Sequence, residues 1–181
     1  NYTFTYFFPK AEEIHITQQT YIKNFLTGFQ NSLNGNSFSE PSGGYSAYLD
    51  VNSFIDFQIV QELTNNVDGY RYSTFFYKEK DSKGGKLHAG PLWDFDLCYG
   101  IVNYSPARLS TSGWLYKDYG ASGSNCMHWW ARLMEDMRYA TSFSERWREL
   151  RDGAFHTDSV MSFIDKTNDL LGSSIEKNFE R

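Results

Sequence analysis

The sequence predicts an α+β fold that is mostly helical and contains one small β-hairpin. Over residues 70–77 the character of the side chains alternates from one residue to the next, and aromatic and β-branched types are common. Both properties favour a strand. Residues 81–85 read Asp-Ser-Lys-Gly-Gly, a composition that reverses the chain, and residues 87–93 are apolar enough to pair back. Helical periodicity characterises the longer segments on either side of this hairpin.

Length and charge limit the class of protein. The 181 residues suit a single domain with a substantial core, and 18% of them are aromatic. A net charge of -5 without a basic run argues against a nucleic-acid partner, because phosphates are held mainly by clustered Lys and Arg. The sequence has no apolar run near the length of a transmembrane segment and no signal-peptide pattern. It begins at Asn1 rather than Met, so we expect a processed or excised piece.

The two cysteines, Cys98 and Cys126, form no metal-binding motif. A disulfide between them and two buried thiols are both compatible with the sequence. The apolar segment around Cys98 favours a buried thiol at that position.

The first helix is predicted to begin with Thr17 as its N-cap and to close at Asn34 and Gly35. Residues 1–8, before it, read as a strand or an extended segment. His15 lies just before the helix and has no partner motif, so a capping or surface role is favoured over that of a catalytic base.

A second helix is predicted from Asp50 to about Asn65. Apolar residues recur in it at four-residue spacing, and others widen the same face, so we expect it to be buried. These residues are Val51, Phe54, Ile55, Phe57, Ile59, Val60 and Leu63.

The C-terminal part is predicted to form three more helices. The spacing predicts that the first of them buries a face made of Met127, Trp130, Met134 and Met137. Ser142 and Glu145 predict a capping box for the next helix, which Gly153 stops. Thr157 is expected to cap the last helix, which continues to Ile175.

Residues 101–125 show no period and are rich in Gly, Ser and Tyr, which predicts a long loop. Such a loop is usually functional or mobile, although an ordinary loop packed by its own aromatic residues is equally compatible. Exposed aromatic side chains in it would also suit a sugar-stacking face. The side chains expected to be exposed are Arg108, Trp114, Tyr116 and Tyr119.

Three carboxylates stand at the open end of the predicted hairpin. Asp68 precedes the first strand, and Asp94 and Asp96 follow the second, so antiparallel pairing would bring the three together. Clustered like charges are tolerated chiefly when a cation or a proton is shared, and oxygen ligands suit magnesium, manganese or calcium. This arrangement suggests phosphoryl chemistry. The alternative is that Asp68 caps a turn with Gly69 and that the other two carboxylates are simply solvated.

The Asn-Val-Asp loop at residues 66–68 and the Trp-Asp-Phe-Asp segment at residues 93–96 resemble the spore coat protein H (CotH) kinase family. The form resembled is the one common in bacterial surface and secreted proteins. Residues 146–151, Arg-Trp-Arg-Glu-Leu-Arg, are similar to the helical tail of that family. The resemblance covers nearly the whole chain, and it implies a secreted or bacterial cell-surface location.

The resemblance implies the C-terminal lobe of an atypical protein kinase. Asp68 would then be the catalytic-loop carboxylate, and Asp94 would hold Mg²⁺ or Mn²⁺ against the phosphates of ATP. Asp96 would hold a second ion or a water. Typical protein kinases place an Asn five residues after the catalytic Asp as a metal ligand, and here that position is Ser73, whose hydroxyl is a weaker ligand.

The implied function is metal-dependent transfer of the ATP γ-phosphate to Ser or Thr of a protein acceptor. The sequence contains neither a Gly-rich phosphate loop nor a clear phosphate-contacting Lys before Asp50. We therefore expect residues 1–181 to be a single C-terminal lobe without its upstream lobe, and to be inactive in isolation. The alternative is a family member that has lost catalysis and serves as a surface scaffold or as a glycan- or protein-binding module.

Overall fold

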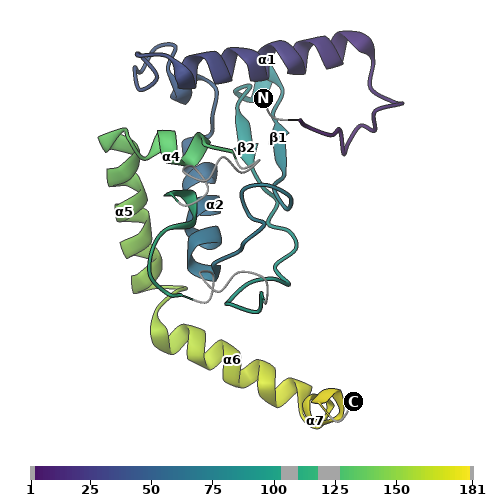
Figure 1. Ribbon diagram of the computed structural model, residues 1–181, viewed down its shortest axis with the longest axis vertical. Helices are drawn as coiled ribbons and strands as arrows, with labels where there is room; N and C mark the ends of the chain where they lie inside the picture. Colours follow the sequence, from purple (N-terminus) through teal and green to yellow (C-terminus); the bar gives the residue numbers. More distant parts are fainter. Residues whose placement is uncertain (1–2, 103–109, 118–126, 180–181) are drawn as a thin grey trace. The chain divides into compact units, whose positions relative to one another are not determined.

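The computed structural model describes residues 3–102, 110–117 and 127–179. These residues are mostly helical and include one two-stranded antiparallel sheet, so the prediction of a mostly helical α+β fold with a hairpin is confirmed (Figure 1). Residues 1–140 and 141–181 form two compact units. A single domain over residues 1–181 stays a prediction. No helix in the described ranges combines the length and the apolar character needed to cross a membrane.

Helix α1, Ile16–Asn34, begins two residues earlier than the sequence predicted. His15 is its N-cap, because the imidazole Nδ1 accepts the N–H of Thr17 while the His15 N–H donates to the side chain of Gln18. The capping role expected of His15 is confirmed, and the choice of Thr17 as N-cap was wrong. The helix closes at Gly35 as predicted.

Helix α2, Val51–Thr64, has the predicted bounds. Asp50 caps its start by accepting the N–H of Ser53 at 2.9 Å, and Asn65 ends it in the left-handed conformation with φ of 51°. Leu63, expected in the core, is 40% exposed. Residues four positions apart on an α-helix differ by about 40° in direction. The apolar residues spaced by four from Val51 therefore rotate around the helix, and by Leu63 they have turned away from the core.

The hairpin is shorter than predicted. Strands β1, Phe76–Lys78, and β2, Leu87–Ala89, pair in register with Tyr77 opposite His88, and the turn between them includes the predicted residues 81–85. The Gly90 N–H donates to the Phe75 carbonyl at 2.9 Å, which continues the pairing by one step toward the open end. Residues 70–73, predicted as strand, form a turn instead.

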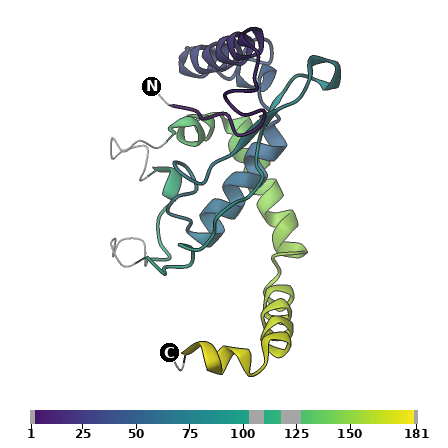
Figure 2. The same ribbon diagram turned by 90° about the vertical axis from the view of Figure 1, so that its right-hand side faces the viewer.

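The core of the first unit is a cluster of aromatic rings between α2, the hairpin and α4, Trp129–Leu133. Trp130 stacks on Phe54 and Phe57 at 5.5 and 5.4 Å and meets Tyr70 at 4.8 Å. Its indole N–H donates to the Phe54 carbonyl at 3.3 Å, which satisfies the one polar atom of the ring. Strand β2 packs on α2, and α1 contacts α4 (Figures 1 and 2).

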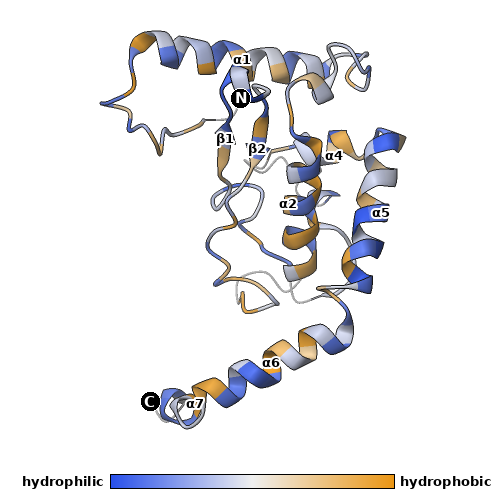
Figure 3. Ribbon diagram, turned by 180° about the vertical axis from the view of Figure 1, so that it is seen from behind, coloured by the Kyte–Doolittle hydropathy of each residue, from blue (hydrophilic) through white to orange (hydrophobic). Residues whose placement is uncertain are grey.

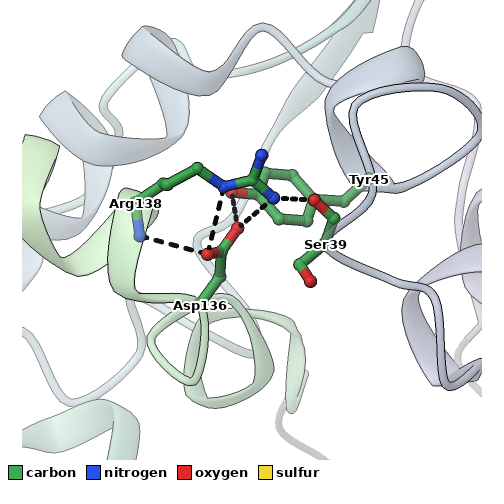
Figure 4. A network of polar contacts seen from close by, with 4 residues as sticks. All are labelled: Ser39, Tyr45, Asp136 and Arg138. Atoms are coloured by element: carbon green, nitrogen blue, oxygen red, sulfur yellow. Dashed lines mark hydrogen bonds and ion pairs between the residues drawn. The ribbon is translucent and has the colours of Figure 1, made fainter.

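A polar clamp, made of Ser39, Tyr45, Asp136 and Arg138, ties the loop after α1 to the turn between α4 and α5 (Figure 4). The Tyr45 hydroxyl donates to Asp136 Oδ2 at 2.8 Å, and Arg138 donates to the same carboxylate from its backbone N–H, Nε and Nη2. Arg138 also donates to the Ser39 carbonyl. Burial and the hydrogen bond to Asp136 hold the pKa of Tyr45 well above its usual range.

We expect Asp136→Ala to lower the free energy of unfolding by about 2 kcal/mol, since it leaves the buried Tyr45 hydroxyl without its acceptor, whereas the Arg138 side chain, 58% exposed, can be solvated. The neighbouring Glu135→Ala is the control. Its carboxylate is 56% exposed and pairs with Arg132 at the surface, so we expect a loss under about 1 kcal/mol. Denaturant unfolding of both variants provides the measurement, and equal losses would contradict a specific role for the clamp.

The C-terminal helices differ in part from the predicted ones. Helix α5, Met137–Asp152, runs through Ser142 without interruption, so the predicted capping box was wrong, whereas the stop at Gly153 is confirmed. Helix α6, Thr157–Leu171, ends at Gly172 with φ of 50°, and α7, Ser174–Phe179, follows as a separate helix. Met137, expected in the core, is 77% exposed.

Helix α6 has hydrophobic and hydrophilic residues alternating along its length (Figure 3). Its N-cap is His156, whose side chain accepts the N–H of Asp158, so the prediction of Thr157 as the cap was wrong. Arg151 of α5 donates to the Phe155 carbonyl and to the Thr157 hydroxyl across the bend that precedes α6. The apolar side chains of α6 are exposed: Val160, Met161, Phe163, Ile164, Leu170 and Leu171.

Candidate functional site

The turn that follows α2 holds Asp68 by its backbone. Asn66 is fully buried, and its side-chain Oδ1 accepts the Asp68 N–H at 3.2 Å. The Asp68 carbonyl oxygen accepts the N–H groups of Arg71, Tyr72 and Ser73 at 3.1 to 3.2 Å. These bonds wrap residues 71–73 around the Asp68 carbonyl, which explains why the strand predicted from residue 70 starts only at Phe76.

The side chain of Asp68 is paired with Arg71. Both Nε and Nη2 of the guanidinium contact Asp68 Oδ1, at 3.0 and 2.9 Å. The two side chains are only 20% and 22% exposed, so the pair is more protected from water than a typical surface ion pair. Asp68 is thus a partly buried carboxylate with its orientation fixed.

Ser73 connects Asp68 to Asp94. Its N–H bonds the Asp68 carbonyl, and its buried hydroxyl donates to Asp94 Oδ2 at 3.3 Å. The hairpin causes this contact, because pairing of Phe75 with Gly90 places the residues before β1 beside those after β2. The structure therefore brings three of the predicted site residues to one end of the hairpin.

Asp94 and Asp96 are exposed and lie on the segment that leads to Cys98. Asp94 has a left-handed backbone with φ of 61°, and Tyr99 has one with φ of 53°, a conformation uncommon for a bulky residue. The Tyr99 N–H donates to the Thr64 carbonyl at 2.7 Å, which fastens this segment to the end of α2.

Cys98 is a free thiol, 1% exposed, as the sequence predicted. Burial raises the pKa of the Cys98 thiol, hydrogen bonding with Thr64 opposes this rise, and the negative charges of Asp96 and Asp94 add to it. Cys126 lies outside the described residues.

The donor set of this site is compatible with a magnesium-type ion. Among the described residues, no group of three or more His, Cys, Asp or Glu side chains is placed to hold a metal. Asp68, Asp94 and Asp96 therefore do not form the three-carboxylate metal cluster that the hairpin suggested, and the exposed Asp94 and Asp96 are the two candidate carboxylates. Magnesium usually binds through one or two carboxylates and takes its other ligands from phosphates and water, so these residues fit such an ion together with a nucleotide.

Glu62 is a residue of this region that sequence reasoning missed. Its carboxylate accepts the N–H of Leu115 at 2.8 Å, the N–H of Tyr116 at 3.0 Å and the hydroxyl of Tyr70 at 2.7 Å. Burial and the nearby Glu62 carboxylate hold the pKa of Tyr70 well above its usual range. Glu62 thereby fastens the segment 110–117 to α2.

This anchoring decides the exposure of the aromatic residues predicted in the long loop. Tyr116 is buried, so the prediction of its exposure was wrong, because its backbone is drawn onto α2 by Glu62. Trp114 is 44% exposed, as expected. Arg108 and Tyr119 lie outside the described residues.

Gly69 is required by space rather than by its backbone angles. A Cβ atom at this position would lie 2.1 Å from Oε1 of Gln61, a residue that is fully buried. The Asp-Gly pair of the sequence thus reflects close packing of the Asp68 turn on α2.

Arg71, the ion-pair partner of Asp68, is a second residue that was not predicted to belong to the site. Its one signal in the sequence was its position three residues after Asp68.

The comparisons with known proteins agree with the resemblance noted in the sequence. A family model described as CotH kinase protein matches residues 2–181. Neither the curated proteins nor the solved structures include a match to the chain.

Proposed function

Because the chain belongs to the CotH kinase family, we propose that it carries the catalytic carboxylates of a kinase that phosphorylates proteins. The reaction would transfer the γ-phosphate of ATP to a Ser or Thr hydroxyl. The observation that best supports this proposal is the linkage of Asp68 and Asp94 through Ser73, which places a fixed carboxylate and an exposed one at the same end of the hairpin. The mostly helical fold around this hairpin is compatible with the C-terminal lobe of an atypical kinase.

Asp68 is proposed to act on the acceptor hydroxyl. As the hydroxyl oxygen forms its bond to the γ-phosphorus, its proton passes to the Asp68 carboxylate. The bond between the γ-phosphorus and the oxygen bridging to the β-phosphate breaks, and ADP leaves with that electron pair. The turn around Asp68 suits this role because its backbone and side chain are both held, and catalysis of phosphoryl transfer depends mostly on positioning.

Asp94 and Asp96 are proposed to hold Mg²⁺ or Mn²⁺. Such an ion would neutralise negative charge on the phosphates of ATP. Ser73 restrains the Asp94 carboxylate by donating to Oδ2. The exposure of both carboxylates is what ligands for a phosphate-bound ion require, since the nucleotide must reach them from solvent.

The test is a transfer assay with ATP labelled on the γ-phosphate, Mg²⁺ or Mn²⁺ and a generic protein acceptor. It is run on the 181-residue chain and on any longer natural protein that contains it. Label transferred to the acceptor and lost on Asp68→Ala would support the kinase proposal. Absence of transfer from every form would instead favour a family member that serves as a surface scaffold or as a glycan- or protein-binding module.

A further inference from the structure

We infer that Arg71 is a positioning residue, which holds Asp68 through Oδ1 and thereby presents Oδ2 as the oxygen that accepts the proton. This inference rests on the proposed function of Asp68. It assigns a task to a residue that lies in sequence between Asp68, the predicted catalytic carboxylate, and Ser73, a predicted cofactor-binding residue.

The contacts of Asp68 select one of its two oxygens. Arg71 Nε and Nη2 both lie within 3.0 Å of Oδ1, whereas no hydrogen bond from the described residues reaches Oδ2. The N–H of Asp68 is held by Asn66, and its carbonyl oxygen accepts the N–H groups that close the turn. With the backbone and Oδ1 fixed, rotation of the carboxylate is restrained, and the position of Oδ2 is defined.

Arg71 is itself restrained. Its guanidinium carbon lies 4.9 Å from the centroid of the Tyr72 ring, a distance at which a cation is attracted to an aromatic face. Its side chain is 22% exposed, so solvent competes weakly for its N–H groups. A planar guanidinium can direct Nε–H and Nη2–H at one oxygen together, which the single ammonium group of a lysine cannot reproduce.

This geometry affects the chemical step more than the binding of nucleotide. A general base must lie within hydrogen-bond reach of the hydroxyl it deprotonates, and a displacement of about 1 Å can lower the rate about 10²-fold. A carboxylate freed from Arg71 could rotate and offer either oxygen in several directions. Asp94 is held by Ser73 rather than by Arg71, so the proposed ligands of the metal would keep their orientation.

The experiment compares Arg71→Gln and Arg71→Lys with the wild-type protein in the transfer assay. We expect kcat to fall about 10- to 100-fold in Arg71→Gln and less in Arg71→Lys, with the affinity for Mg²⁺-ATP unchanged. Arg146→Gln is the matched control. It removes an arginine that forms an ion pair at the same spacing of three residues, with Glu149 at 2.8 Å in α5, and should leave kcat unchanged.

A double variant separates positioning from general stabilisation. If Arg71 acts through Asp68, then adding Arg71→Gln to Asp68→Asn should cause no further loss of kcat. A further loss equal to that in the wild-type background, or a wild-type kcat in Arg71→Gln, would overturn the inference while leaving the kinase proposal standing. A weaker affinity for Mg²⁺-ATP with normal kcat would also overturn it, since Arg71 would then serve the nucleotide.

Thermal unfolding identifies a variant that fails to fold. If Arg71→Gln does not fold, Arg71→Lys, which preserves the charge, takes its place. A lowered kcat with unchanged affinity for Mg²⁺-ATP then supports the inference, and a wild-type kcat or a weakened affinity overturns it. A wild-type protein that transfers no phosphate in any form would overturn the proposed function, and the inference about Arg71 would fall with it.

Discussion

Asp94→Asn is expected to abolish binding of Mg²⁺-ATP while leaving the fold intact. The change removes the negative charge of a proposed ligand with little change in size. Asn can also accept the Ser73 hydroxyl and tolerates the left-handed backbone, φ of 61°, that Asp94 adopts. Calorimetric titration with ATP and Mg²⁺ measures the binding, and thermal unfolding checks the fold.

The control for this prediction is Asp165→Asn, which removes one exposed carboxylate from α6. It should leave the affinity for Mg²⁺-ATP at the wild-type value. If both variants lowered the affinity equally, the effect would reflect net charge rather than a ligand at position 94. Unchanged affinity in Asp94→Asn would remove Asp94 from the site.

Asp68→Asn should spare nucleotide binding and lower kcat about 10²- to 10⁴-fold, as expected when a positioned base is lost. The amide can still accept from Arg71 through its oxygen, so the turn should remain folded. Single-turnover transfer measures the chemical step, and titration with Mg²⁺-ATP measures the binding. A loss of nucleotide affinity as large as that of Asp94→Asn would contradict the division of roles between the two carboxylates.

The elements that the sequence predicted well are those set by neighbouring residues. Asp50 and Asn65 lie at the two ends of α2, and each signals its end by its own local chemistry, a side-chain cap at one and a left-handed residue at the other. The Gly-rich turn at residues 81–85 likewise has a local signal, its Gly84 and Gly85 with positive φ, although the Tyr21 hydroxyl of α1 also donates to Asp81. From the hairpin alone, the contact of the Asp94 segment with the residues before β1 could be anticipated.

The features that sequence reasoning missed depend on residues far apart in the chain. Glu62 binds backbone N–H groups more than 50 positions later, and no periodicity records such a contact. The burial of Tyr116 follows from it. The shortened strand has a similar origin, because the composition of residues 70–73 suits a strand while the Asp68 carbonyl draws them into a turn. The break at Gly172 had a local signal, a glycine, that the apolar spacing outweighed.

Because Cys98 is buried beside the candidate site, the rate at which its thiol is chemically labelled depends on motion of that site. Alkylating reagents must reach the sulfur atom, and this thiol is only 1% exposed. Its labelling therefore requires the segment that carries Asp94 and Asp96 to open transiently. An ion or nucleotide that binds those carboxylates would reduce such opening and slow the alkylation of Cys98. The rate of alkylation therefore measures binding at the site even when no phosphate is transferred.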